Sequence, residues 1–216
     1  MSTVPNIGQL EAFLFRTDLE LLRRAFRASC QTLVAERERA EADVRKLYGL
    51  GPSDPWPEDD EANADFGEEI GARQDSAEDA LNEIVIAFTM TLFHFWERRC
   101  NRWLAVHYYD GAKVQAALNA VGLPTWDHRV VQLQLVANAL KHGNGKSCTA
   151  LFDAYPALFA SDGTSPGPVA DAEAIRVSAA LWEEWASAIE AAGPTPSWYF
   201  TRHPEKRHLW IGGPRS

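Results

Sequence analysis

One segment of the sequence, residues 76–107, restricts the possible fold most strongly because it is apolar on two helical faces. A first stripe at helical spacing consists of Leu81, Val85, Phe88, Leu92, Phe95 and Trp103. A second stripe, on roughly the opposite side, consists of Ile86, Met90 and Phe93. A helix with two apolar faces lies at the centre of a bundle, or packs its own core on one side and a second subunit on the other. The sequence therefore predicts a helical bundle around this segment.

Helical periodicity extends through most of the remaining chain. It predicts further helices over about residues 9–47, 111–121, 126–142 and 171–192, with a short helical turn around 148–155. A convincing series of alternating strands is lacking, so the predicted class is all-α, with about five main helices. We expect one bundle domain over residues 1–193, interrupted by an acidic loop at 48–75, and an irregular C-terminal tail over 194–216.

The acidity of the chain is concentrated in one place. The formal net charge is −9, yet residues 48–80 contain eleven acidic residues and one arginine, whereas the rest carries 20 basic and 19 acidic residues. This distribution does not exclude an RNA partner for the remainder of the molecule. Glu58, Asp59, Asp60 and Glu61 lack the spacing of a calcium-binding loop, so a solvated acidic loop is favoured over a metal site.

The sequence gives no sign of a membrane span, an export signal or a cofactor. The apolar stretch over residues 84–96 is interrupted by Thr89, Thr91 and His94. Three cysteines without metal-like spacing indicate free thiols in a reducing compartment. We therefore expect a cytoplasmic protein that works without a metal or cofactor.

The segment over residues 136–147, VANALKHGNGKS, is the candidate functional site. Gly143 follows a Lys-His pair, which is typical of a helix C-terminus. Asn138 and His142 share one helical face, at the polar end of an apolar stripe. The GNGKS run resembles a phosphate-binding loop, but Leu140 occupies the position of the first glycine and a helix precedes it. His142 and Cys148 lack a third orienting group, so a thiol nucleophile is not favoured.

Two other regions offer candidate polar sites. Glu97 continues the second apolar stripe beside Arg98 and Arg102, and it is either semi-buried or an exposed partner of a neighbouring arginine. A metal site built from His94, Glu97 and His142 would have no recognisable ligand spacing. The tail carries aromatic and basic residues that either stack on single-stranded bases or pack over the bundle or a partner subunit; these are Trp198, Tyr199, Phe200, Arg202, Lys206, Arg207, Trp210 and Arg215.

The helix ending in Asn138-x-x-x-His142, within LVANALKHGNGKSCTALFDAYPALF, resembles the HEPN superfamily and its abortive-infection and toxin-like relatives. The resemblance covers residues 76–107 and 126–160. It implies a dimeric helical bundle and, in catalytic members, a metal-independent ribonuclease with an Arg-x4-6-His motif facing its twin across the dimer. His142 matches the motif histidine and Asn138 the polar residue after the arginine, whereas Ala137 stands at the arginine position.

Two functional hypotheses follow. The first is a non-catalytic binding or regulatory module of a defence or toxin–antitoxin system, which the alanine at position 137 favours. The alternative is an endoribonuclease with His142 as general acid or base at a dimer interface, assisted by Asn138. Lys141, Lys146 and Arg102 would then offset phosphate charge. We expect a homodimer, with a protein or RNA as further partner.

Overall fold

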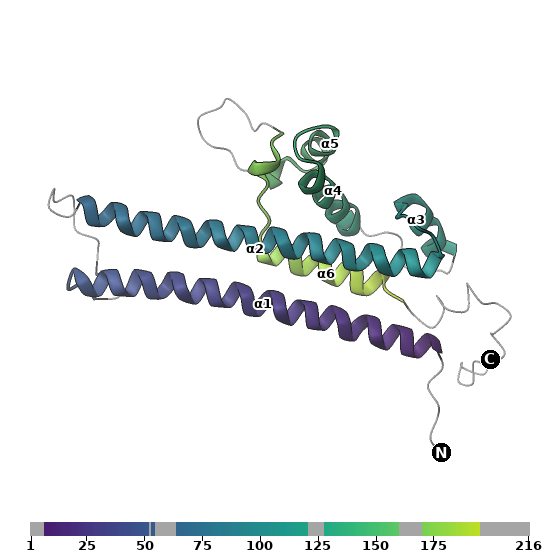
Figure 1. Cartoon of the computed structure of the whole chain (residues 1–216), viewed down its shortest axis with the longest axis horizontal. Helices are drawn as coiled ribbons and strands as arrows, with labels where there is room; N and C mark the ends of the chain where they lie inside the picture. Colours follow the sequence, from purple (N-terminus) through teal and green to yellow (C-terminus); the bar gives the residue numbers. More distant parts are fainter. Residues whose placement is uncertain (1–6, 52, 55–63, 121–127, 160–169, 195–216) are drawn as a thin grey trace, which may run out of the picture. The chain divides into compact units, whose positions relative to one another are not determined.

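The computed structural model describes residues 7–51, 53–54, 64–120, 128–159 and 170–194. Their secondary structure is helical apart from an isolated antiparallel bridge between Phe159 and Ile175. Two long helices, α1 (Ile7–Leu47) and α2 (Ala64–Leu104), precede the shorter α3 (Gly111–Ala120), α4 (His128–His142), α5 (Lys146–Ala154) and α6 (Ala179–Ala192) (Figure 1). The prediction of an all-α fold with about five main helices is confirmed.

The chain divides into two compact units. The first unit comprises residues 1–23 and 89–216, and the second comprises residues 24–88. The short helices α3 to α6 belong entirely to the first unit, so the second contains only segments from the two long helices and the chain between them. In each unit α1 packs against α2, through Phe15 and Phe95 in the first and Phe26 and Phe88 in the second.

The acidic loop is shorter than predicted, because α2 begins at Ala64 and includes residues 64–75. Pro52, Pro55 and Pro57 lie before this point, and the segment that follows contains alanine and glutamate, which favour helix. Glu58, Asp59, Asp60 and Glu61 lie outside the described residues.

The last helix also begins later than predicted. The chain forms a 3-10 turn, η3 (Ala172–Ala174), and becomes extended at Ile175 before α6 starts. Ser178 precedes α6 and its side-chain oxygen accepts a hydrogen bond from the amide of Leu181 at 3.1 Å. This N-cap satisfies an amide that has no partner within the helix, which explains why α6 begins here.

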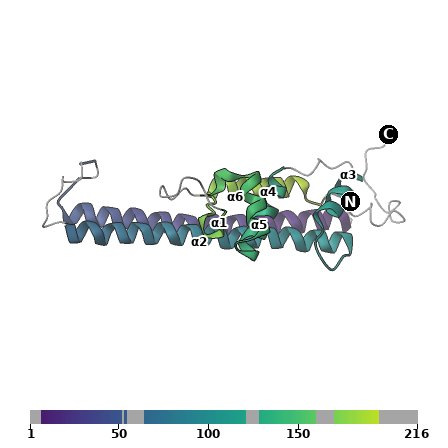
Figure 2. The same ribbon diagram turned by 90° about the horizontal axis from the view of Figure 1, so that it is seen from above.

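The first unit has a core rich in tryptophan. Its largest fully buried side chains are Trp96, Trp182, Trp185, Phe15, Leu19, Leu92, Leu118, Leu133, Leu151, Ile175 and Ile189. α4 packs against both α5 and α6, and η2 (Pro156–Leu158) follows α5 (Figure 2). α4 and α6 therefore contribute to the same core, and this packing fixes the C-terminal end of α4, where the candidate site lies.

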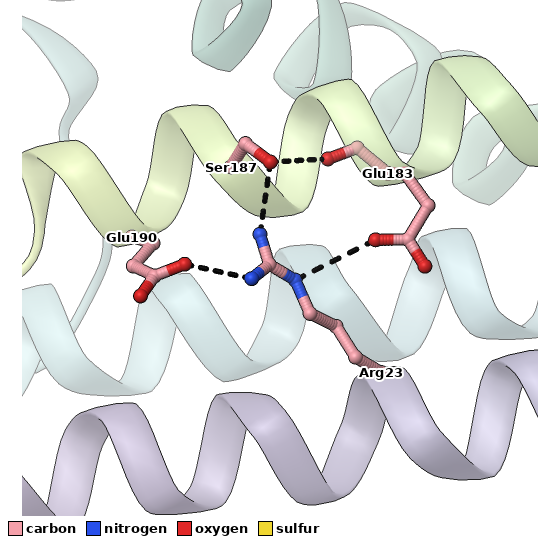
Figure 3. Close-up of polar contacts among 4 residues, drawn as sticks. All are labelled: Arg23, Glu183, Ser187 and Glu190. Atoms are coloured by element: carbon pink, nitrogen blue, oxygen red, sulfur yellow. Dashed lines mark hydrogen bonds and ion pairs between the residues drawn. The ribbon is translucent and has the colours of Figure 1, made fainter.

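Arg23 of α1 connects to α6 through three acceptors (Figure 3). Its guanidinium donates to Glu190 at 2.7 Å and to Ser187 at 2.9 Å, and its Nε lies 3.6 Å from a carboxylate oxygen of Glu183. The Arg23 side chain is only 12% exposed, so these charge-assisted contacts are partly shielded from water. They hold α6 against the N-terminal part of α1.

Replacing Arg23 with methionine is expected to lower the free energy of unfolding by about 1–2 kcal/mol, because charge-assisted hydrogen bonds are lost from a partly buried site. Urea unfolding followed by circular dichroism measures the change. Arg39→Met is the matched control, since Arg39 also pairs with a glutamate but is 72% exposed, and a change within about 0.5 kcal/mol is expected there. Equal losses in the two variants would contradict a specific role for Arg23.

Among the described helices, none has both the length and the apolar character needed to cross a bilayer.

Candidate functional site

The candidate site lies where α4 ends and α5 begins. His142 is the last residue of α4 and is exposed, as are Lys141 before it and Lys146 at the start of α5. Asn138, one turn earlier, is half-buried. The three residues Lys141, His142 and Lys146 thus present two cations and an imidazole at a single turn, which we call the α4–α5 turn (residues 141–146).

Local backbone geometry sets the shape of the turn. Gly143 has a φ of 65° and donates its amide to the carbonyl of Ala139 at 2.9 Å. A left-handed residue directly after a helix is strongly favoured as glycine, because a Cβ is strained there. The predicted C-cap is therefore confirmed. It ends α4 abruptly and leaves His142 at the end of the helix.

Asn144 gives the turn a second anchor. Its side-chain oxygen accepts a hydrogen bond at 2.7 Å from the amide of Ala172, the first residue of η3. Sequence reasoning identified the Asn-Gly pair as a turn, but it did not predict this contact 28 residues away. The anchor ties the α4–α5 turn to the segment that leads into α6.

The position of the motif arginine is inaccessible in this fold. Ala137 is 1% exposed, and Val136 beside it is fully buried. An arginine at position 137 would carry its charge into the core, where an unpaired charge is costly. Asn138 is half-buried and His142 is exposed, whereas Ala137 is closed to solvent. The helix therefore presents the asparagine and histidine positions of the motif to solvent, but not the arginine position.

Glu97 and Arg102 lie on α2 rather than on the α4–α5 turn. Glu97 is half-buried, and its carboxylate lies 3.1 Å from Nδ1 of His94, one helical turn earlier. Glu97 is thus half-buried, which was one of the two alternatives for this residue, and it contacts His94. Arg102 is exposed in the last turn of α2.

A buried polar cluster near the end of α2 went unrecognised in the sequence. Trp96 donates its indole N–H to the hydroxyl of Tyr109 at 3.2 Å, and Cys100 nearby is fully buried. Burial raises the pKa of Tyr109, and Cys100 and Glu97 raise it further. Burial likewise raises the pKa of Cys100. Trp96, Glu97 and Cys100 lie within about one turn of α2, whereas Tyr109 lies in the loop after it, so their spacing carried no recognisable motif.

Replacing Tyr109 with phenylalanine is expected to reduce the alkaline loss of stability. In the unfolded chain this tyrosine has a pKa of about 10, and in the folded protein its pKa is higher. The contribution of Tyr109 to the free energy of unfolding is therefore complete below pH ~10 and falls as the pH rises further, because the unfolded chain ionises first. The free energy of unfolding should therefore fall less steeply with pH in Tyr109→Phe, by about 1.4 kcal/mol per pH unit above pH ~10. Urea titrations at several pH values measure this slope.

Tyr108→Phe is the control for this prediction, because the Tyr108 side chain is 65% exposed. Its slope should match that of the unmodified protein. A Tyr109→Phe slope that also matches the unmodified protein would contradict the effect assigned to burial.

The described residues contain no group of three or more His, Cys, Asp or Glu side chains that could hold a metal ion.

Comparisons of the chain with models of protein families, with curated proteins and with solved structures returned no match.

Proposed function

We propose that this chain is a HEPN-like, non-catalytic binding module of a defence or toxin–antitoxin type system, and that it binds RNA through the α4–α5 turn. The burial of Ala137 is the observation that carries the non-catalytic part of the proposal. The exposed Lys141, His142 and Lys146 support phosphate binding, because cations positioned on a fixed backbone are the usual partners of a nucleic-acid backbone.

The geometry of the turn supports recognition of an RNA phosphate backbone rather than of a small ligand in a deep pocket. The three side chains are solvent-exposed, and two anchors, the Gly143 cap and the Asn144 contact with Ala172, hold the backbone that carries them. α5 has no acidic residue in its first turn, so its N-terminal amides add positive potential beside Lys146. Contacts of this kind bind the backbone of RNA with little dependence on sequence.

A homodimer remains part of the proposal. In the resemblance to the HEPN superfamily, two copies place their motif histidines opposite one another, and this would double the number of cations facing one RNA. The exposure of His142 is compatible with such an arrangement. The acidic loop would then be available for a protein partner.

The second candidate function is a metal-independent ribonuclease, and the exposure of His142 is the observation that favours it. An accessible imidazole is able to move a proton to or from a ribose hydroxyl, with half-buried Asn138 orienting the substrate. The phosphate charge would then be offset by Lys141 and Lys146 rather than by an arginine at position 137.

Incubation with fluorescent single-stranded RNA separates the two functions. We expect the protein to raise the anisotropy of the RNA while denaturing gels show the RNA intact, and we expect the RNA to stay intact with His142→Ala as well. Chelator is added to every sample, and RNA alone serves as the background. Cleavage above that background by the unmodified protein, abolished in His142→Ala, would instead establish the ribonuclease.

A further inference from the structure

An exposed apolar stripe runs along the N-terminal part of α1. Leu10, Phe13, Leu14 and Leu21 are 46%, 64%, 43% and 51% exposed. Their spacing places them on one side of the helix, over about 17 Å of its length. The opposite side carries the buried Phe15 and Leu19, so α1 is apolar on both faces here. We call the four exposed residues the α1 stripe.

A stripe of this size is unusual on a surface left to water. Single exposed leucines are common, but a contiguous group with a phenylalanine at its centre marks a place where another segment packs. All four residues belong to the first compact unit, which also contains the C-terminal part of the chain. The stripe and the C-terminal part of the chain thus belong to the same unit.

The described part of the chain ends close to this stripe. Gly193, just after α6, is buried so closely against Phe15 that an added Cβ would lie 2.3 Å from the ring. Pro194 is buried as well, and the chain continues from there into residues 195–216. Phe15 lies on the opposite face of α1 from Phe13, at nearly the same level along the helix axis. The tail thus leaves the described structure at the level of the stripe, on the other side of α1.

The composition of residues 195–216 suits such a surface. Trp198, Tyr199 and Phe200 are consecutive and begin four residues after Pro194. At ~3.3 Å per residue, these few residues span about 13–20 Å, which is enough to pass around a helix about 10 Å across and reach Phe13 and Leu14. Aromatic rings bury a large apolar area against leucine and phenylalanine side chains.

Connection within one chain favours the tail over a second copy. The tail leaves the described structure at Pro194, within reach of Phe13, so its effective concentration at the stripe is high. Charges of both signs border the stripe, namely Glu11 and Glu20 with Arg16 and Arg24. The tail continues with Arg202, Lys206 and Arg207 after its aromatic residues.

We propose that residues 195–216 dock on the α1 stripe of the same chain, with Trp198, Tyr199 and Phe200 covering Phe13 and Leu14. The contact buries the apolar face that α1 would otherwise expose to water. It also places the basic end of the tail beside Glu11 and Glu20. This inference is independent of RNA binding at the α4–α5 turn.

Photo-crosslinking in the full chain tests the proposal. Phe13→p-benzoylphenylalanine is prepared as a mixture of unlabelled and 15N-labelled protein, and cross-linked peptides are identified by mass spectrometry. We expect cross-links from position 13 to residues 195–216 within the same isotopic species. Mixed-isotope cross-links would instead assign the stripe to a second copy and overturn the proposal, as would the absence of cross-links to the tail.

Hydrogen exchange provides a second measurement. In Phe13→Ser/Leu21→Ser, amides of residues 195–216 should exchange at least about tenfold faster than in the unmodified protein, because the apolar contact is removed. Both positions are exposed in the described fold, so the substitutions leave the core intact. Tyr108→Ser, at another exposed aromatic position, should leave tail exchange unchanged. Equal tail exchange in the stripe variant and the unmodified protein would overturn the proposal.

Discussion

Replacing Trp185 with alanine is expected to lower the free energy of unfolding by about 3–5 kcal/mol, because it leaves a large cavity in the core of the first unit. Trp185 is fully buried, and its indole donates to the side-chain oxygen of Gln132 at 3.0 Å. Arg129 donates to the same oxygen at 2.9 Å and pairs with Glu184 on α6. The substitution would therefore remove both apolar packing and one donor to a buried amide.

Urea unfolding monitored by far-ultraviolet circular dichroism measures this loss without relying on tryptophan fluorescence. Val131→Ala is a suitable control, since Val131 lies on α4 but is 36% exposed, and the loss in this variant should stay below about 1 kcal/mol. If Trp185→Ala lost no more than this control, the proposed packing of α4 against α6 would be wrong.

Reversing the charges of Lys141 and Lys146 is expected to weaken RNA binding by at least about tenfold in Lys141→Glu/Lys146→Glu. Each lysine that contacts a phosphate releases counterions from the RNA, and each glutamate adds repulsion at the same place. Both side chains are exposed, so the fold should be preserved. Fluorescence anisotropy with labelled single-stranded RNA at fixed salt measures the affinity.

A matched pair of substitutions controls for the overall change in charge. Arg37→Glu/Lys46→Glu alters the net charge by the same amount at exposed positions of α1. Because phosphate contacts act over short distances in physiological salt, this control should bind RNA with nearly unchanged affinity. Equal weakening in both pairs would indicate a general charge effect rather than a site at the α4–α5 turn.

The helices were predictable because their apolar residues recur at helical spacing. α1 and α3 occur close to their predicted ranges, and α4 ends at the Gly143 cap as expected. The start of α2 was missed because residues 64–75 are acidic rather than amphipathic, although their helix propensity is adequate. The start of α6 was missed because Ile175 continues the apolar pattern while its backbone is extended.

The candidate site was predictable only in part. Sequence pattern placed Asn138 on the same face as His142, and the resemblance placed Ala137 at the position of the motif arginine. The contact of Asn144 with Ala172 and the burial of Tyr109 depend on which segments meet in space, which periodicity along one helix does not specify. The pairing of Glu97 with His94 was missed because the nearby arginines offered an equally plausible partner at helical spacing.

The salt dependence of RNA affinity tests most directly the claim that this chain binds RNA through the α4–α5 turn. For single-stranded RNA, log Kobs falls with log salt at a slope of about −0.7 per phosphate contact, so Lys141→Glu/Lys146→Glu should reduce the magnitude of that slope by about 1.4. The control pair Arg37→Glu/Lys46→Glu should keep the slope of the unmodified protein. A slope that is the same in all three proteins, or no RNA binding by the unmodified protein, would contradict the proposed function.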